Sequence, residues 1–159
     1  MPVSGSGRPR LAACGALIAA VCASAAAAPS EGGLYIAGAG FSFQVAAERA
    51  MAQNPGGRRF FLLSLPPETA ALAAGAGPAP TALRRRVAAA NGVLLVCRRD
   101  LDNGRVPAAG LAPGVAAVRG WPPAGSAELP PGQRHFAGED PASLPASNEA
   151  LRRLRAACS

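Results

Sequence analysis

The sequence predicts a small α/β domain, a three-layer parallel sheet of about four or five strands with flanking helices. Short apolar runs bounded by turn residues recur along the chain, and segments with helical patterning alternate with them. Short loops join these segments, which favours parallel strands with right-handed crossovers. The length of 159 residues suits one domain, and a hydrophobic content of 50% excludes intrinsic disorder.

The first strand and the first helix lie on either side of the turn residues Gly38-Ala39-Gly40. Residues 34–37 form a short apolar run that leads into this turn, which predicts a strand. Residues 42–54 have helical patterning, and Pro55-Gly56-Gly57 ends the helix. We expect the apolar face of this helix to consist of Val45, Ala46, Met51 and Ala52.

A buried strand and two alanine-rich segments follow. Residues 60–65 are a continuous apolar run, which is typical of a parallel strand covered on both faces. A short turn or helix is expected over residues 66–74. Because Thr81 is a good N-cap, the next helix is predicted over residues 82–90, and it ends at Asn91-Gly92.

The strongest strand pattern in the chain covers residues 92–97, where an apolar run stops sharply at an arginine. One or two turns of helix are expected over residues 98–103, and a weaker strand is expected over residues 115–118. Ser147 is the predicted N-cap of a final helix. Its first turn carries a glutamate and its last turns carry arginines, an order that the helix dipole favours.

Residues 1–27 have the three zones of a secretory signal peptide. Two arginines precede an uncharged apolar run at residues 11–23, and small residues follow it. Cleavage is expected between Ala27 and Ala28, which predicts a periplasmic or secreted protein. The apolar run is shorter than the roughly 20 residues that a permanent membrane anchor needs, so no such anchor is expected.

The mature chain is then a single domain over residues 28–159, with a Pro/Gly-rich segment at 122–146. Its net charge falls from +7 to +5, because 14 arginines remain against 9 acidic residues. A lipid-attachment box ending at Cys14 is the alternative to a cleaved signal, although this cysteine precedes most of the apolar run.

Cys97 is the candidate reactive residue. It ends the strongest strand, and ligands of open α/β sheets collect at the carboxyl ends of strands. Arg98 and Arg99 follow at the start of a predicted helix, so their charges and the helix field favour a thiolate. An unreactive buried cysteine is the alternative. In an oxidising compartment Cys97 can also form a single disulfide with Cys158.

The segment around Cys97 resembles the DsrE-like family. The resemblance rests on Gly92-Val93-Leu94-Leu95-Val96-Cys97 followed by a short helix, and on Leu111-Ala112-Pro113-Gly114-Val115. The order of the elements upstream is also similar, and the likeness spans roughly residues 34–121. The family includes DsrE/DsrF-type sulfur-relay proteins, in which a cysteine at the place of Cys97 carries persulfide sulfur, and its members often assemble as trimers or hexamers.

Two functions follow from these observations. The first is thiol or persulfide sulfur chemistry through Cys97, with Arg98 and Arg99 stabilising the thiolate, in a homo-oligomer or with a sulfur-relay partner protein. The second is a non-catalytic periplasmic binding or assembly module in which a Cys97–Cys158 disulfide is structural. The resemblance by itself does not make the chain an enzyme, because one fold serves many functions.

Other function classes are disfavoured by the residues that the sequence lacks. No Cys/His cluster has metal-ligand spacing, so no metal site is expected. No cofactor is expected, because Phe43 stands where a dinucleotide-binding loop has its third glycine. The only histidine, His135, lies in the Pro/Gly-rich segment and is expected to be a solvated loop residue. No nucleic-acid partner is expected, because the arginines are scattered without interleaved aromatic residues.

Overall fold

The computed structural model describes residues 31–106, 110–121, 129 and 132–159. The predicted signal peptide lies outside the described residues, and so does part of segment 122–146. Within the described residues, no helix combines the length and the apolar character needed to cross a membrane.

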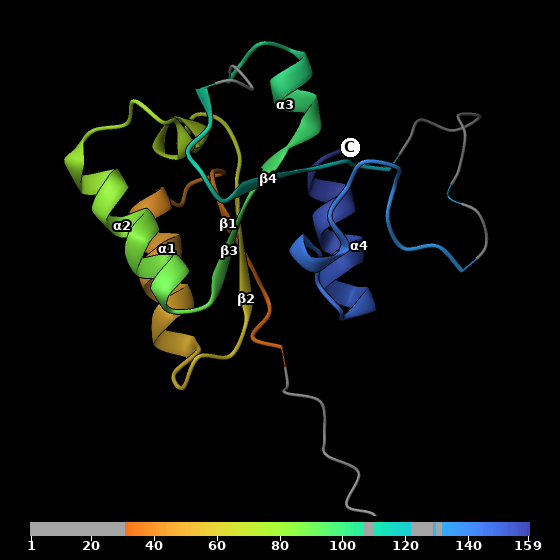
Figure 1. The fold of residues 1–159 in the computed structure, drawn as a ribbon, viewed down its shortest axis with the longest axis horizontal. Coiled ribbons are helices and arrows are strands. Elements are labelled where there is room, and N and C mark those ends of the chain that lie inside the picture. Colours follow the sequence, from red (N-terminus) through yellow and green to blue (C-terminus); the bar gives the residue numbers. More distant parts are fainter. Residues whose placement is uncertain (1–30, 107–109, 122–128, 130–131) are drawn as a thin grey trace, which may run out of the picture.

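Four parallel strands form one sheet in the order β1-β2-β3-β4, which confirms the predicted α/β class (Figure 1). The strands are β1 (Leu34–Ala37), β2 (Phe60–Ser64), β3 (Gly92–Cys97) and β4 (Val115–Val118). Their boundaries follow the predicted apolar runs closely, and only β2 ends one residue early. Because all four strands are parallel, their carboxyl ends lie at the same end of the sheet, where Ala37, Ser64 and Cys97 are found.

Helices cover both faces of the sheet, which produces the three predicted layers (Figure 1). Helices α1 (Phe43–Gln53) and α2 (Pro78–Ala89) pack on one face, and α4 (Asn148–Ala157) packs on the other. The short helix α3 (Arg98–Asp102) directly follows β3. Two 3-10 helices, η1 (Glu68–Leu72) and η3 (Pro141–Ser143), lie in the connections.

Strand β2 shows why the apolar run was continuous rather than alternating. Phe60 and Leu62 belong to the core beneath α1 and α2, whereas Phe61 and Leu63 belong to the core beneath α4. All four side chains are fully buried. Successive side chains of a strand point to opposite faces, so a strand with two covered faces needs apolar residues at every position.

The predicted apolar face of helix α1 was right for Ala46, which is buried, and for Met51, which packs against the core, but wrong for the other two residues. Its buried residues are Phe43, Ala46, Ala47 and Ala50, whereas Val45 and Ala52 are exposed. The buried positions recur every three to four residues and lie on one side of the helix. Positions 45 and 52 lie on the opposite side, so residue type alone misplaced them. The exposed Val45 becomes relevant to the surface described below.

The predicted start of helix α2 was also wrong. The helix begins at Pro78 with Gly77 as its N-cap, and Thr81 lies within its first turns. Prolines are tolerated there because the first N–H groups of a helix have no acceptor within the helix. The Thr81 hydroxyl instead donates to the carbonyl of Ala76 at 3.2 Å. By contrast, Ser147 is the N-cap of α4 as predicted, and its hydroxyl accepts from the N–H of Ala150 at 3.3 Å.

Candidate functional site

Cys97 lies at the carboxyl end of β3 and is the N-cap residue of α3, so the strand and the helix both determine its position. Its side chain is fully buried within the core beneath α4. Burial follows from its neighbours, because β2 and β4 flank β3 on both sides and α4 covers this face.

A disulfide joins Cys97 to Cys158, the C-cap residue that directly follows helix α4. The two sulfur atoms are 2.04 Å apart and the two Cα atoms are 5.1 Å apart. Both cysteines are buried, with 0% and 3% of their surface exposed. In this bonded form Cys97 has neither a proton to lose nor a free sulfur to carry persulfide, so the disulfide would have to open before any thiolate formed.

Arg98 and Arg99 lie beside the disulfide, but carboxylates already engage them. The Arg98 Nε atom is 3.0 Å from Asp102 Oδ1, in a pair that is largely exposed. The Arg99 Nε atom is 3.4 Å from Oδ1 of the fully buried Asp100, and Arg99 also donates to the carbonyl of Ser159. These acidic partners weaken the field that the two arginines exert at Cys97. Sequence reasoning missed Asp100 as a buried group, because nothing local indicates its burial.

A shallow hollow of about 530 Å³ lies next to the disulfide. Its lining includes Cys158, Trp121 and the three arginines Arg98, Arg99 and Arg119. Trp121 is 45% exposed and therefore lies at the surface. The structure therefore brings the predicted residues together at one place, with Cys158 facing the hollow and Cys97 behind it.

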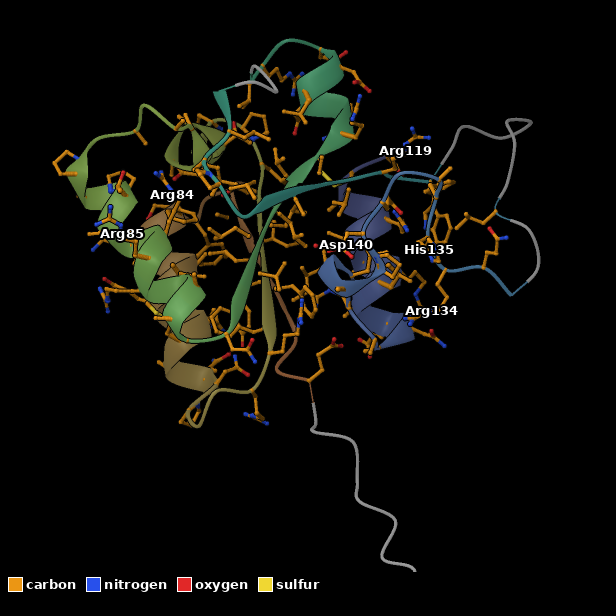
Figure 2. The ribbon with its side chains drawn as sticks, viewed as in Figure 1. Arg84, Arg85, Arg119, Arg134, His135 and Asp140 are labelled. Carbon is orange, nitrogen blue, oxygen red and sulfur yellow. A yellow bond between two sulfur atoms is a disulfide. The ribbon has the colours of Figure 1, made fainter. Side chains whose placement is uncertain are left out.

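Beneath this region a buried ion pair fastens α4 to the segment before it. The Arg155 guanidinium donates to both carboxylate oxygens of Glu139, at 2.5 and 2.8 Å. It also donates to the backbone carbonyls of Arg119 and Arg134, which Figure 2 shows beside α4. The centre of the guanidinium lies 4.8 Å from the centroid of the Phe136 ring. Arg155 therefore links helix α4 to two loop segments, one at Arg119 and one at residues 134–139.

The pKa of Glu139 reflects two opposed effects. Burial by itself raises the pKa of this carboxyl, because desolvation disfavours the charged form. Hydrogen bonds from Arg155 and from the backbone N–H groups of Arg119 and Phe136 favour the charged form and outweigh burial. The pKa of Glu139 is therefore lowered below its ordinary value of 4.5.

Carboxylates of the chain already occupy the N-termini of helices α1 and α4. Glu68 accepts from the N–H of Phe43 at 2.7 Å, at the start of α1. Glu31 accepts from the N–H groups of Ala146 and Ser147 at 2.7 to 3.0 Å, at the start of α4. A phosphate group of a dinucleotide would bind at the N-terminus of α1, where the Glu68 carboxylate already lies.

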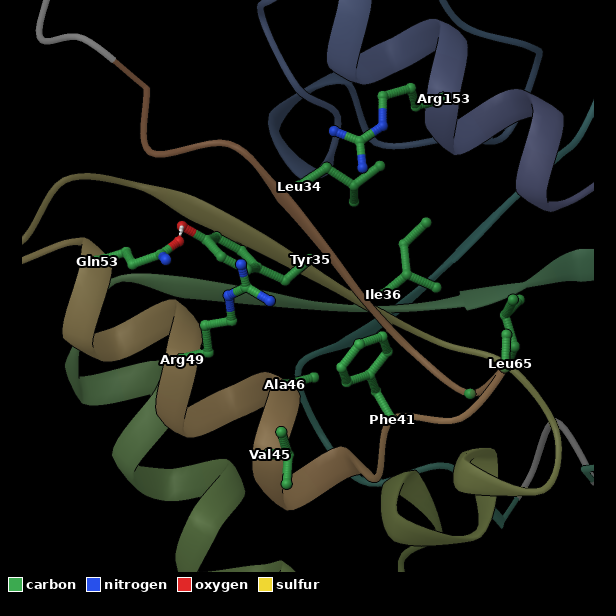
Figure 3. A pocket seen from close by; sticks show the side chains of 12 residues that line it. Leu34, Tyr35, Ile36, Phe41, Val45, Ala46, Arg49, Gln53, Leu65 and Arg153 are labelled. Carbon is green, nitrogen blue, oxygen red and sulfur yellow. Dashed lines mark hydrogen bonds between the residues drawn. The ribbon is translucent and has the colours of Figure 1, made fainter.

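A second hollow, of about 500 Å³, runs along β1 between α1 and α4 (Figure 3). It is separate from the disulfide, and sequence reasoning missed it. Its apolar lining includes Ile36 from β1 and Phe41 and Val45 from the turn and helix that follow. Arg49 of α1 and Arg153 of α4 supply its charges. The sequence does contain one signal for this hollow. Val45 and Arg49 are four residues apart and therefore share the exposed side of α1.

His135 is exposed on the segment that precedes α4, which agrees with a solvated loop residue (Figure 2). In the described part of the chain, no group of three or more His, Cys, Asp or Glu residues is arranged to hold a metal ion.

Comparison with known protein families, with curated proteins and with solved structures finds no match to this chain. The resemblance to the DsrE-like family therefore stays a prediction, as do the sulfur-relay role and the oligomeric assembly that it implies.

Proposed function

We propose that the chain is an exported, non-catalytic binding module in which the Cys97–Cys158 disulfide is structural. The observation that carries this proposal is the pairing of the two cysteines, both of them buried, between the end of β3 and the end of α4. A disulfide in this place supports export to an oxidising compartment, because such bonds persist there and are rare in the cytosol.

The disulfide has a clear mechanical task in such a module. It closes a separation of 61 residues and joins α4, the only α-helix packed on its face of the described structure, to the inner strand β3. On the chain-entropy account, a cross-link that closes a loop of this length stabilises the folded protein by about 4 kcal/mol, because it restricts the unfolded chain. The bond therefore keeps α4 on the sheet, and with α4 it maintains one wall of the hollow beside β1.

Alkylation of the purified, exported protein, followed by measurement of its intact mass, tests this proposal. Without reductant, neither cysteine should react even after unfolding, and the mass should be lower by two hydrogen atoms than that of the reduced chain. A Cys158→Ser variant is the matched control, because its Cys97 should react once the chain is unfolded. Quantitative alkylation of Cys97 in the unreduced wild-type protein would contradict the proposal.

Sulfur relay through Cys97 is the second candidate function, and the arginine-lined hollow supports it. Cys158 lines that hollow whereas Cys97 is fully buried. A partner thiolate that attacked Cys158 Sγ would form a mixed disulfide, break the bond to Cys97 and release Cys97 as a thiolate. Arg98 and Arg99 would then stabilise the charge.

This second function predicts a specific product. After reduction and treatment with polysulfide, the protein should gain sulfur on Cys97, and a Cys97→Ser variant should gain none there. Failure of the reduced wild-type protein to gain sulfur on Cys97 would exclude the relay.

A further inference from the structure

The free edge of the sheet at β1 presents unpaired backbone groups. β1 is the first strand in the order, so it pairs with β2 on one side only. The carbonyls of Gly33 and Ala37 accept from the N–H groups of Phe61 and Leu65, at 3.0 and 2.9 Å. Alternate residues of a parallel strand bond to opposite sides, so the N–H and C=O groups of the residues between them, at positions 34 and 36, face the free edge.

The same edge carries exposed apolar side chains. Phe41 is 52% exposed and Val45 is 48% exposed, and both line the hollow along β1 (Figure 3). In the described part of the chain, Trp121 is the only other large hydrophobic side chain with comparable exposure. An open strand edge beside a pair of exposed apolar side chains is a surface for association.

Charge indicates what kind of partner fits. Arg49 and Arg153 reach the hollow from opposite sides, from α1 and α4 (Figure 3). No ion pair among the described residues includes either of them. A second copy of this chain would bring the same two arginines to the same edge, on a protein whose predicted mature chain has a net charge of +5. Like charges disfavour that arrangement, whereas carboxylates complement it.

We propose that an extended, acidic segment of a partner protein adds to β1 as a further strand. Its backbone would pair with the free N–H and C=O groups of Leu34 and Ile36, as in strand addition. Because side chains of a strand alternate between faces, some would contact Phe41, Val45 and Arg49 on the α1 side, and others would meet Arg153 on the α4 side. The inference deepens the proposed function, since it names the partner of the binding module.

Fluorescence anisotropy with a labelled peptide of two Val-Val-Glu-Glu repeats, which places glutamate on both faces of the added strand, tests this inference on the disulfide-bonded protein. The double variant Arg49→Gln/Arg153→Gln should weaken binding by at least about tenfold. Arg85→Gln/Arg152→Gln is the matched control, because it removes two exposed arginines that do not line the hollow and changes the net charge equally. The control should weaken binding by no more than about twofold.

A second peptide separates strand addition from simple charge attraction. Methylation of alternate backbone nitrogens removes the donors along one edge of the peptide while the side chains and the charge stay the same. The peptide methylated on the edge that pairs with β1 should bind about tenfold more weakly or worse, whereas the peptide methylated on its other edge should bind within about twofold of the unmethylated peptide. Equal binding of the methylated peptides would overturn the inference, and so would equal losses in the two arginine variants.

Two further outcomes are decisive. Absence of binding to the wild-type protein would overturn the inference. Sedimentation that showed a dimer of the wild-type protein and a monomer of the Phe41→Arg variant would also overturn it, because a second copy would then cover this edge. Alkylation of the same preparation distinguishes this failure from that of the proposed function. Lost peptide binding with an intact disulfide contradicts the inference alone, and a free Cys97 with intact peptide binding contradicts the structural role of the disulfide alone.

Discussion

The two faces of the sheet are closed by different means. Beneath α1 and α2, the core consists of apolar side chains such as Phe60, Leu62 and Val87, with small alanines on the buried side of α1. Beneath α4, apolar packing is joined by a disulfide and by the buried Arg155–Glu139 pair. The carboxylate of Glu31 adds hydrogen bonds at the start of α4.

This difference follows from how many helices each face has. Two long helices cover the first face, so its core depends mainly on apolar packing, and Glu68 and the buried Arg84 add hydrogen bonds to backbone groups there. A single helix of ten residues covers the second face, so covalent and charge-assisted bonds supply what packing does not. The first face should therefore be sensitive to side-chain volume, and the second face should also be sensitive to redox state and to pH.

Truncation of the two adjacent phenylalanines of β2 should have the largest effect and should separate the faces. Phe60→Ala and Phe61→Ala should each lower the free energy of unfolding by about 3 to 5 kcal/mol, because each leaves a cavity in a buried core. Urea unfolding of the oxidised and reduced proteins measures the coupling. The effect of Phe61→Ala should change on reduction by at least about 0.5 kcal/mol, because Phe61 shares its core with both cysteines.

Phe60→Ala is the control for this coupling, because Phe60 belongs to the opposite core. Its effect should be the same in the oxidised and the reduced protein. Equal coupling for both variants would mean that the two faces do not respond separately.

Loss of the disulfide should have the next largest effect. The variant Cys97→Ala/Cys158→Ala should be less stable than the oxidised wild type by about 4 kcal/mol, because the unfolded chain regains the freedom of a long loop. Urea unfolding measures the change, and reduction of the wild-type protein should reproduce most of it. A difference below about 1 kcal/mol would mean that packing alone holds α4 on the sheet.

The Arg155–Glu139 pair should give the second face its pH dependence. Glu139→Gln should lower the free energy of unfolding at neutral pH by about 3 kcal/mol, because it leaves the buried Arg155 without its counter-charge. The pKa of Glu139 is lowered in the folded protein, so the unfolded chain binds the proton more readily. The stabilisation is therefore complete above pH values near 4.5 and is lost as the pH falls through the lowered pKa.

Thermal or urea unfolding across acidic pH checks this dependence. The wild-type protein should lose stability more steeply than Glu139→Gln as the pH falls. Glu48→Gln serves as the control, because Glu48 is exposed on α1 and should leave the slope unchanged. Parallel slopes for the wild type and Glu139→Gln would contradict the assignment.

The smallest effects should come from the N-caps, which offer a matched pair on the two faces. Ser42 caps α1 and Ser147 caps α4, with hydroxyl-to-amide distances of 3.2 and 3.3 Å. Ser42→Ala and Ser147→Ala should each lower the free energy of unfolding by about 1 kcal/mol. Denaturation measurements should find the two losses equal within about 0.5 kcal/mol, and a clear inequality would show that the faces also differ in how their helices begin.

Much of the fold was predictable because its signals are local. The apolar run that became β3 lies between Gly92 and Arg98, and its length and boundaries indicate a strand without reference to other residues. The cap Ser147 was predictable for the same reason. The start of α2 was misplaced because Thr81 has the side chain of a good N-cap, whereas Pro78 fits the first position of a helix equally well.

The candidate site was predictable only in part. Cys97 was placed at the end of a strand, and Cys158 was considered as its possible partner, but spacing alone does not pair two cysteines. Arg155 and Glu139 are sixteen residues apart and belong to a helix and a loop, so no local pattern joins them. Arg49 and Arg153 line the same hollow, although their helices are about 100 residues apart in the sequence.

The sequence by itself determined where strands and helices occur, because hydrophobic periodicity, capping residues and turn residues act between near neighbours. It also determined that arginine is the only strongly basic side chain available anywhere in the molecule. Only the tertiary structure decided which side of α1 is buried, that Cys97 meets Cys158, and that Asp100, Glu139 and Arg155 are buried. These outcomes depend on contacts between residues far apart in the chain, and the packing of whole elements determines such contacts.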